Sequence, residues 1–322
     1  MNLYNPKITE TNPEDKVTAP ESLVFSGGGI KGLAYVGVIN ALEEKQLFQN
    51  VKRFAGSSAG AITAALLAIG MNAEELDKQM SSVDFSTFLK KSTVNIEALV
   101  DKTSELLLTG PAVIIDEITK RGLCDGSVFV QWLTSMFKLK GFDETTTFAE
   151  LYEKTGNELI IVLCYANCSK TVLACHTSAE TSNMPVITAV RGSMSIPIVF
   201  EPLIWNNNVY LDGGTMYNYP IEVFDENPSP DKTLGFILST KSSVLTPPRK
   251  EDIGILSHLA CIYDAIMNVS YEYCFRMENH HRTVFIDPAG IGPLDFKLTE
   301  DQKKALKDNG YKATIDYLEN LN

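Results

Sequence analysis

The chain has 322 residues, a formal net charge of -12 and a hydrophobic content of 44%. So acidic a chain is a poor candidate for binding nucleic acid, because phosphate contacts need clustered Lys and Arg. The same charge opposes electrostatic attraction to anionic lipid, so any contact with a membrane should be mainly apolar. Length and hydrophobic content suit a globular protein with one large or two ordinary domains.

Residues 1–20 are polar and contain several Pro, Asn, Glu and Thr residues, which predicts a disordered tail. Residues 21–322 show no internal repeat and no linker strong enough to divide them, so we expect a single domain. Neither a signal peptide nor an apolar run long enough to span a bilayer is visible. We expect a cytoplasmic protein with transient membrane association, and export without a cleaved signal peptide stays open.

In chain order, the first predicted elements alternate between strand and helix. A strand at 23–25 ends in a glycine-rich loop, and a helix with an apolar stripe follows at 33–48. A second strand at 52–55 leads into an apolar helix at 59–69. This alternation predicts a parallel sheet flanked by helices.

Residues 73–121 lack strand signals and are expected to be mainly helical. Within this region, 83–122 is equally consistent with a mobile cover over the site and with ordinary helical packing. Further helices are expected at 128–139, 147–154, 189–194, 253–279 and 299–321, and further strands at 159–165, 170–176, 203–205, 209–211, 233–239 and 283–286.

The pentapeptide Gly56-Ser57-Ser58-Ala59-Gly60 has the form G-x-S-x-G. In that form a serine sits on a tight strand-to-helix turn with its hydroxyl exposed. Gly56 and Gly60 suit such a nucleophile elbow, where backbone meets backbone and no Cβ fits. The N-terminus of the next helix brings free N–H groups and partial positive charge near the serine. The pattern predicts Ser58 as the nucleophile of a hydrolase.

A second glycine-rich stretch, Gly27-Gly28-Gly29-Ile30-Lys31-Gly32, follows the first strand. It matches G-x-G-x-x-G, but the second strand does not end in the acidic residue that a dinucleotide site needs. Glycines at a helix start leave backbone N–H groups uncovered, so we predict an oxyanion hole, with a plain tight turn as the alternative. The candidate residues are Gly27, Gly28, Gly29, Lys31 and Gly32.

A serine nucleophile needs a general base, which is usually histidine. The four histidines are His176, His258, His280 and His281, and none lies in a glycine-rich turn, so surface or packing roles are favoured for them. Asp212, in Leu211-Asp212-Gly213-Gly214, ends a strand-like run and is the better candidate. A pocket that excludes water would raise the pKa of the Asp212 carboxyl and make it a better base. The alternative interpretation is that Asp212 and the two glycines after it form an ordinary β-turn.

Six cysteines in a chain without a visible signal peptide suggest reduced thiols in the core. Cys164, Cys168 and Cys175 with His176 fit no familiar zinc spacing, and buried structural cysteines are the favoured interpretation. The sequence therefore predicts neither a metal nor a cofactor.

Taken together, the three motifs resemble those of the patatin-like phospholipases. That family has G-G-G-x-[RK]-G as an oxyanion hole, G-x-S-x-G as the nucleophile elbow, and D-G-[GA] with the second catalytic residue. Residues 191–197 (RGSMSIP) and 218–220 (NYP) resemble two further family segments, with Gly192 where alanine is common. The resemblance covers residues 21–224.

The resemblance implies a three-layer α/β/α sandwich with a mostly parallel central sheet. It also implies a Ser58–Asp212 dyad without histidine, and calcium independence. The backbone N–H groups of Gly28 and Gly29 would hold the oxyanion, with that of Gly32 as a further candidate. The expected substrate is a phospholipid or lysophospholipid, and whether a protein activates the enzyme stays open. Two alternatives are kept: a catalytically silent lipid-binding or regulatory module, and a general carboxylesterase, including a histidine-dependent one.

Overall fold

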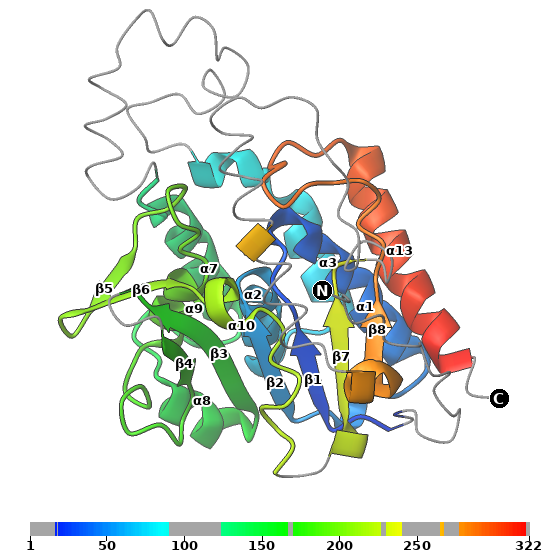
Figure 1. Cartoon of the computed structure of the whole chain (residues 1–322), viewed down its shortest axis with the longest axis horizontal. Coiled ribbons are helices and arrows are strands. Elements are labelled where there is room, and N and C mark those ends of the chain that lie inside the picture. The colour runs from blue at the N-terminus through cyan, green and yellow to red at the C-terminus, as the bar shows by residue number, and fades with distance from the viewer. Residues whose placement is uncertain are drawn as a thin grey trace, which may run out of the picture.

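A mixed β-sheet forms the centre of the chain. The computed structural model describes residues 17, 19–89, 124–166, 170–226, 230–239, 265–266 and 277–319. Within them eight strands pair in the order β5-β6-β3-β2-β1-β7-β8, and β4 pairs with β3 (Figure 1). The strands are β1 (Ser22–Phe25), β2 (Arg53–Ser57), β3 (Glu158–Tyr165), β4 (Lys170–Ala174), β5 (Leu203–Trp205), β6 (Asn208–Asp212), β7 (Thr233–Ile237) and β8 (Thr283–Phe285).

Strand directions divide the sheet into two parts. The run β3-β2-β1-β7-β8 is parallel throughout, whereas β4 and β6 pair antiparallel with β3, and β5 pairs antiparallel with β6. Every residue of β1 and β7 is buried, as expected for parallel strands covered on both faces. The carboxyl ends of β1 and β2 lie at one edge of the sheet, which is where open α/β sheets bind ligands.

Helices follow most of the strands. They are α1 (Ala34–Glu44), α2 (Ala59–Ala68), α3 (Ala73–Ser82), α7 (Ser127–Leu139), α8 (Phe148–Thr155), α9 (Val186–Ser193), α10 (Gly214–Tyr217) and α13 (Glu300–Glu319), with 3-10 turns η2 (Gly29–Leu33), η3 (Phe48–Asn50), η4 (Phe85–Leu89), η5 (Pro230–Lys232) and η6 (Met277–Arg282). Capping boxes define two of the helix starts, Asn72 with Glu75 at α3 and Thr147 with Glu150 at α8.

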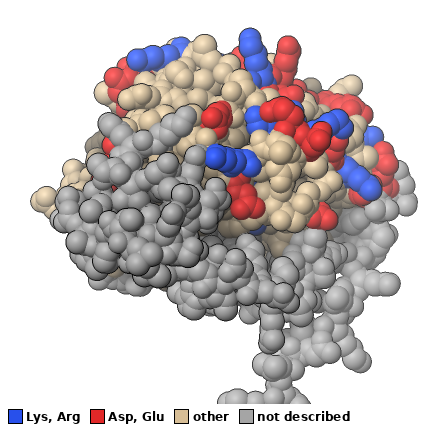
Figure 2. Space-filling view, turned by 90° about the horizontal axis from the view of Figure 1, so that it is seen from above, with Lys and Arg blue, Asp and Glu red and all other residues tan. Residues whose placement is uncertain are grey.

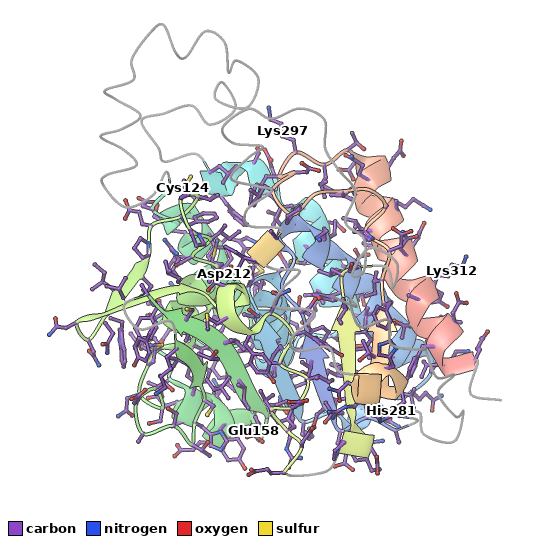
Figure 3. The ribbon with its side chains drawn as sticks, viewed as in Figure 1. Cys124, Glu158, Asp212, His281, Lys297 and Lys312 are labelled. Carbon is purple, nitrogen blue, oxygen red and sulfur yellow. The ribbon has the colours of Figure 1, made fainter. Side chains whose placement is uncertain are left out.

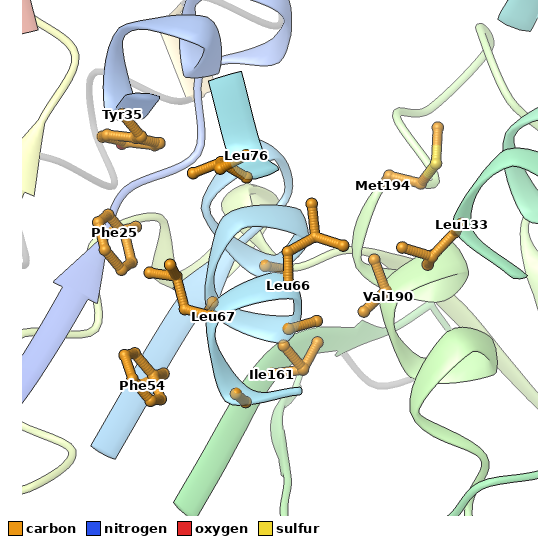
Figure 4. Close-up of a cluster of buried hydrophobic side chains, with 14 of the residues drawn as sticks. Phe25, Tyr35, Phe54, Leu66, Leu67, Leu76, Leu133, Ile161, Val190 and Met194 are labelled. Carbon is orange, nitrogen blue, oxygen red and sulfur yellow. The ribbon is translucent and has the colours of Figure 1, made fainter. Parts of the chain in front are cut away.

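Alternate strand residues supply two cores, one on each face of the sheet. Phe25 and Phe54 face the helices, where they pack with Leu67 of the almost fully buried α2 (Figure 4). Val24 and Ala55, the neighbours of those residues in the strands, belong to a smaller second core. In the described part of the chain, the second core is covered by the segment that follows α10, through Tyr219, Ile221 and Phe224.

Most elements expected from the sequence are confirmed, with shifts at their ends. The helix expected at 33–48 begins as the 3-10 turn η2 and ends at Glu44. The strand expected at 52–55 continues through Gly56 and Ser57, because both residues pair with β3. The mostly parallel sheet flanked by helices is the fold class that the sequence predicts.

Some expectations fall on other parts of the chain. Residues 1–16, residues 90–122 of the candidate cover, and most of the helix expected at 253–279 lie outside the described residues. Val17 is described and buried, and its N–H donates to the Tyr317 hydroxyl of α13 over 3.1 Å. The single domain expected for 21–322 stays a prediction. Among the helices that the structure describes, none combines the length and apolar character required to cross a bilayer.

Candidate active site

Ser58 occupies the turn between β2 and α2, in a backbone conformation of φ 50° and ψ -119°. A serine rarely adopts a positive φ, and such strain is typical of catalytic turns. The Ser58 N–H donates to the Ser193 hydroxyl over 2.9 Å, which helps to hold the turn. A Cβ on Gly60 would lie 2.2 Å from the Phe25 carbonyl oxygen, so only glycine permits α2 to start this close to β1.

Asp212 ends β6, immediately before α10, near the middle of the view (Figure 3). Strand pairing brings it close to Ser58. Ser57 lies opposite Val162 of β3, and Asp212 lies opposite the next β3 residue, Leu163. The two residues of the predicted dyad therefore stand at the same level of the sheet, on either side of β3.

The Asp212 carboxyl is fully buried, and burial raises its pKa from 3.8 to about 7. Hydrogen bonds from the Ser58 hydroxyl and the Gly214 N–H oppose this rise because they favour the anion. The Gly214 N–H donates to Oδ1 over 2.7 Å. No described residue meets ordinary hydrogen-bond limits at Oδ2, so the Ser58 contact is the looser of the two. The carboxyl can therefore both accept and release a proton near neutral pH.

The glycine loop follows β1 and faces the start of α2. Its first amide, Gly27 N–H, donates to the Asn218 carbonyl over 3.1 Å, so in this arrangement it is not available to an oxyanion. The amides of Gly28 and Gly29 have no hydrogen-bond partner among the described residues. Of the first three glycine amides, those of Gly28 and Gly29 are therefore the ones available to an oxyanion.

Contacts from distant segments fix the conformation of the glycine loop. Gly29 has a φ of 59°, and a Cβ there would lie 2.0 Å from the Pro293 carbonyl oxygen. The Ile30 N–H donates to that same oxygen over 3.1 Å. The Lys31 ammonium donates to the Leu238 carbonyl over 3.4 Å, so it supports the loop through that contact. Gly32 lies within η2, where a Cβ would be 2.8 Å from the Ala59 Cβ.

An apolar pocket opens above Ser58. Phe88 of η4 packs against Phe129 and Trp132 of α7, with ring centroids 5.5 Å and 5.6 Å apart. Ser58 is the one polar side chain among the described residues that line this pocket. The lining comprises Gly29, Ile30, Gly32, Leu33, Ser58, Ala59, Ile62, Met80, Phe85, Phe88, Phe129, Trp132, Met194, Ile196, Phe200 and Phe296. Such a pocket suits a hydrocarbon chain with its polar end at the serine.

The described histidines lie elsewhere. His176 stacks on Tyr152 with ring centroids 4.1 Å apart, and the His280 ring packs against Phe285. His281 accepts a hydrogen bond from Tyr317 at its carbonyl. None of the three lines the pocket, and His258 is outside the described residues. The structure therefore gives no described histidine the place of a general base.

The described cysteines, Cys124, Cys164 and Cys175, are buried, and none of them forms a disulfide bond within the described residues. Burial raises the pKa of the Cys124 thiol to about 12, so this group is a poor nucleophile at neutral pH. Cys168 lies outside the described residues. Within the described ranges, no group of three His, Cys, Asp or Glu side chains is arranged to hold a metal ion.

Comparison with known proteins identifies the family of the chain. The model of the patatin-like phospholipase family matches residues 23–225, so the chain belongs to that family. Protein YqhO of Bacillus subtilis (strain 168) is 28% identical over 92% of this chain and 97% of its own length. The probable lipid hydrolase 463L of invertebrate iridescent virus 6 is 30% identical over 63% of this chain and 62% of its own.

Among solved structures, VipD from Legionella pneumophila superposes with a TM-score of 0.57 at 19% identity, over 94% of this chain and 67% of that chain. This likeness supports the fold. The family match, together with the similarity to a probable lipid hydrolase, indicates that the chain is a hydrolase from a family of lipid hydrolases.

Two features of the site were not predicted from the sequence. The aromatic wall combines Phe88, Phe129 and Phe296 from three separate segments. Ser193 contacts the turn at Ser58, and Asn218 contacts the glycine loop, and both residues come from segments far along the chain. The segments 191–197 and 218–220 are recognisable as motifs in the sequence, but their spacing does not show which of their atoms contact the turn at Ser58 or the glycine loop.

Proposed function

We propose that the protein is a serine acyl hydrolase of the phospholipase A or lysophospholipase type, with Ser58 as nucleophile and Asp212 as general base. The observation that supports this most is the position of Ser58, the one polar side chain in an otherwise apolar pocket of described residues, beside a buried carboxyl whose pKa is about 7. A pKa near the working pH is what a general base requires.

In the proposed reaction, the Ser58 Oγ attacks the ester carbonyl carbon while its proton passes to Asp212. The amides of Gly28 and Gly29 donate to the tetrahedral oxyanion. When that intermediate collapses, the alcohol leaves with the proton from Asp212, and the acyl group stays on Ser58. Water then attacks the acyl carbonyl while one of its protons passes to Asp212. When this second tetrahedral intermediate collapses, the proton returns from Asp212 to the Ser58 Oγ and the fatty acid leaves.

A lipid panel tests this proposal. Purified protein is incubated with phospholipid, lysophospholipid, triacylglycerol and short-chain ester, and mass spectrometry follows fatty-acid release. We expect phospholipid or lysophospholipid to be cleaved fastest, and a calcium chelator to leave the rate unchanged because no step uses a metal. Preference for the short-chain ester would favour a general carboxylesterase, and no turnover of any substrate would favour a catalytically silent module.

The oxyanion hole gives a separate prediction. Alanine at Gly29 would collide with Pro293 and strain a φ of 59°, which should displace the amides and lower kcat about 100-fold. Gly290→Ala is a matched control, since its φ of 72° imposes similar strain but no described atom lies within 4 Å of the new Cβ. Steady-state kinetics on one substrate compares the two. Equal losses in both variants would remove the glycine loop from the mechanism.

We also propose that the mouth of the pocket contacts the lipid surface through Ile198. This residue lies between Ile196 and Phe200 of the pocket lining, is 37% exposed, and has a φ of 74°. A positive φ is unusual for a β-branched residue. This strained backbone and the exposed side chain together support a role for Ile198 at the surface. On the face in Figure 2, Lys and Arg side chains are interspersed with Asp and Glu in the described part, so no purely basic patch for anionic lipid is visible there.

Placing a charge at that point should weaken the membrane contact. We expect Ile198→Asp to reduce binding to phosphatidylcholine vesicles about tenfold in a sedimentation assay, because a buried apolar side chain contributes about 1.5–3 kcal/mol. Hydrolysis of a soluble short-chain ester should change little. Leu139→Asp, at the end of α7 and 62% exposed, is the control. Equal effects of the two variants would contradict the role of Ile198.

A further inference from the structure

The end of α9 and the residues after it contact both members of the proposed dyad. The Ser58 N–H donates to the Ser193 hydroxyl over 2.9 Å. The Asp212 N–H donates to the Ser195 carbonyl over 3.0 Å. Ser193 and Ser195 are both fully buried. One short segment, residues 191–195, therefore holds the backbone of the nucleophile and the backbone of the base.

Arg191 fixes that segment from within. Its Nη1 donates to the Ser195 hydroxyl over 2.7 Å, and the same hydroxyl donates to the Arg191 carbonyl over 3.1 Å. Its Nη2 donates to the carbonyls of Glu201 over 2.9 Å and Asp125 over 3.0 Å, and its Nε also donates to Asp125. Only 7% of the residue is exposed. A planar guanidinium can serve three acceptors at once, which a lysine ammonium cannot do with the same geometry.

These acceptors belong to the walls of the site. Asp125 precedes Ser127, where α7 begins, and α7 supplies Phe129 and Trp132 to the pocket. Glu201 precedes β5, the partner of the strand that ends in Asp212. Arg191 therefore contacts a residue just before α7, a residue just before the β5–β6 strand pair, and Ser195. Ser195 belongs to the segment 191–195, which contacts both residues of the proposed dyad.

We propose that Arg191 is a positioning residue for catalysis, acting through Ser193 and Ser195 to set the separation of the Ser58 hydroxyl and the Asp212 carboxyl. Such positioning matters here because Ser58 is held in a strained turn and its hydrogen bond to Asp212 is loose. A small shift of either group in such an arrangement is costly, since misplacement by about 1 Å can cost 100-fold in rate.

The role is one of geometry and not of charge. The influences on the pKa of Asp212 are burial, the Ser58 hydroxyl and the Gly214 amide, and the Arg191 charge is not among them. Replacing Arg191 should therefore lower kcat and leave the acid limb of the pH–rate profile near pH 7. An electrostatic role would instead move that limb.

The test compares two buried arginines. Arg191→Lys keeps the positive charge but loses the planar guanidinium and its set of N–H donors. Arg282→Lys does the same at a site outside the pocket lining, where the guanidinium pairs with Asp225 through contacts of 2.6 Å and 2.8 Å. Both variants should lose thermal stability. Well below both melting temperatures, we expect kcat to fall about 30-fold in Arg191→Lys with KM within threefold of wild type, and to stay within twofold in Arg282→Lys.

Ser193→Ala and Ser195→Ala make the test independent of the folding of the arginine variant. Ser193→Ala removes the hydroxyl that accepts the Ser58 N–H, and Ser195→Ala removes the hydroxyl that accepts from Arg191 Nη1. Each should lower kcat about tenfold without moving the acid limb. Wild-type kcat in both serine variants, or equal losses in the two arginine variants, would overturn the proposal. The proposal rests on the Ser58–Asp212 mechanism, so Ser58→Ala is assayed in parallel: activity retained there rejects the mechanism, whereas activity lost there but kept in the positioning variants rejects the positioning role alone.

Discussion

Ser58→Ala and Asp212→Asn are each expected to lower kcat for lipid ester hydrolysis by at least about 1,000-fold, with small effects on KM. Without the Ser58 hydroxyl no acyl-enzyme can form, and without the Asp212 carboxylate nothing accepts the proton of the nucleophile. Residues that act as one unit are strongly non-additive, so the double variant should be no slower than the slower single variant. Fatty-acid release from the preferred lipid of the panel measures all three.

The controls separate the dyad from a histidine-dependent mechanism. His176, His258, His280 and His281 are replaced by alanine one at a time, and each variant should retain activity within twofold of wild type. Full activity in Ser58→Ala or Asp212→Asn would remove the dyad. A loss of 1,000-fold in any histidine variant would instead point to a triad.

Ionisation of the buried Asp212 carboxyl should lower the free energy of unfolding at neutral and higher pH. Burial raises the pKa of Asp212 from 3.8 to about 7 in the folded state, so folding favours the protonated form. The stabilisation that comes from the protonated carboxyl is fully present below about pH 4 and is lost as the pH rises to about 7. Because the shift is about three pKa units at 1.36 kcal/mol each, ionisation costs roughly 4 kcal/mol of unfolding free energy.

Asp212→Asn cannot ionise and should escape that loss. We expect its advantage in unfolding free energy over wild type to be roughly 4 kcal/mol larger at pH 8 than at pH 4, as measured by urea unfolding at both pH values. Ser58→Ala is the control, because it is inactive but keeps the carboxyl. It also loses the hydrogen bond that opposes the rise in the Asp212 pKa, so its stability should depend on pH at least as strongly as that of wild type. A pH-independent difference between Asp212→Asn and wild type would mean that the carboxyl has an ordinary pKa.

Much of this arrangement could be predicted from the sequence, because each main component is a short contiguous motif at the end of a strand. Gly27 to Gly32 follow β1, Ser58 follows β2, and Asp212 ends β6. A local pattern of glycines indicates a tight turn wherever it occurs, and the carboxyl ends of the parallel strands β1 and β2 lie at one edge of the sheet. Asp212 reaches that edge in another way, because β6 runs antiparallel to β3 and pairs only with its last residues, Leu163 to Tyr165.

Tertiary contacts could not be predicted in the same way. Gly27 looks as suitable for an oxyanion as Gly28, but its amide is bound by Asn218, which is brought there by the turn after Asp212. Gly56 looks like the end of a strand, yet β2 continues through it because β3 supplies a pairing partner. Both outcomes depend on segments distant in the chain, so no window of sequence contains them.

The most direct measurement of the central claim is the labelling of Ser58 by a lipid-like fluorophosphonate, in which the Ser58 Oγ bonds to phosphorus and fluoride leaves. Peptide mapping by mass spectrometry identifies the adduct, and the labelling rate is followed from pH 5 to pH 9. We predict one adduct, on Ser58, with a rate that rises through about pH 7 as Asp212 ionises, and very slow labelling in Asp212→Asn. An adduct on another residue, or wild-type labelling of Asp212→Asn at every pH, would contradict the dyad.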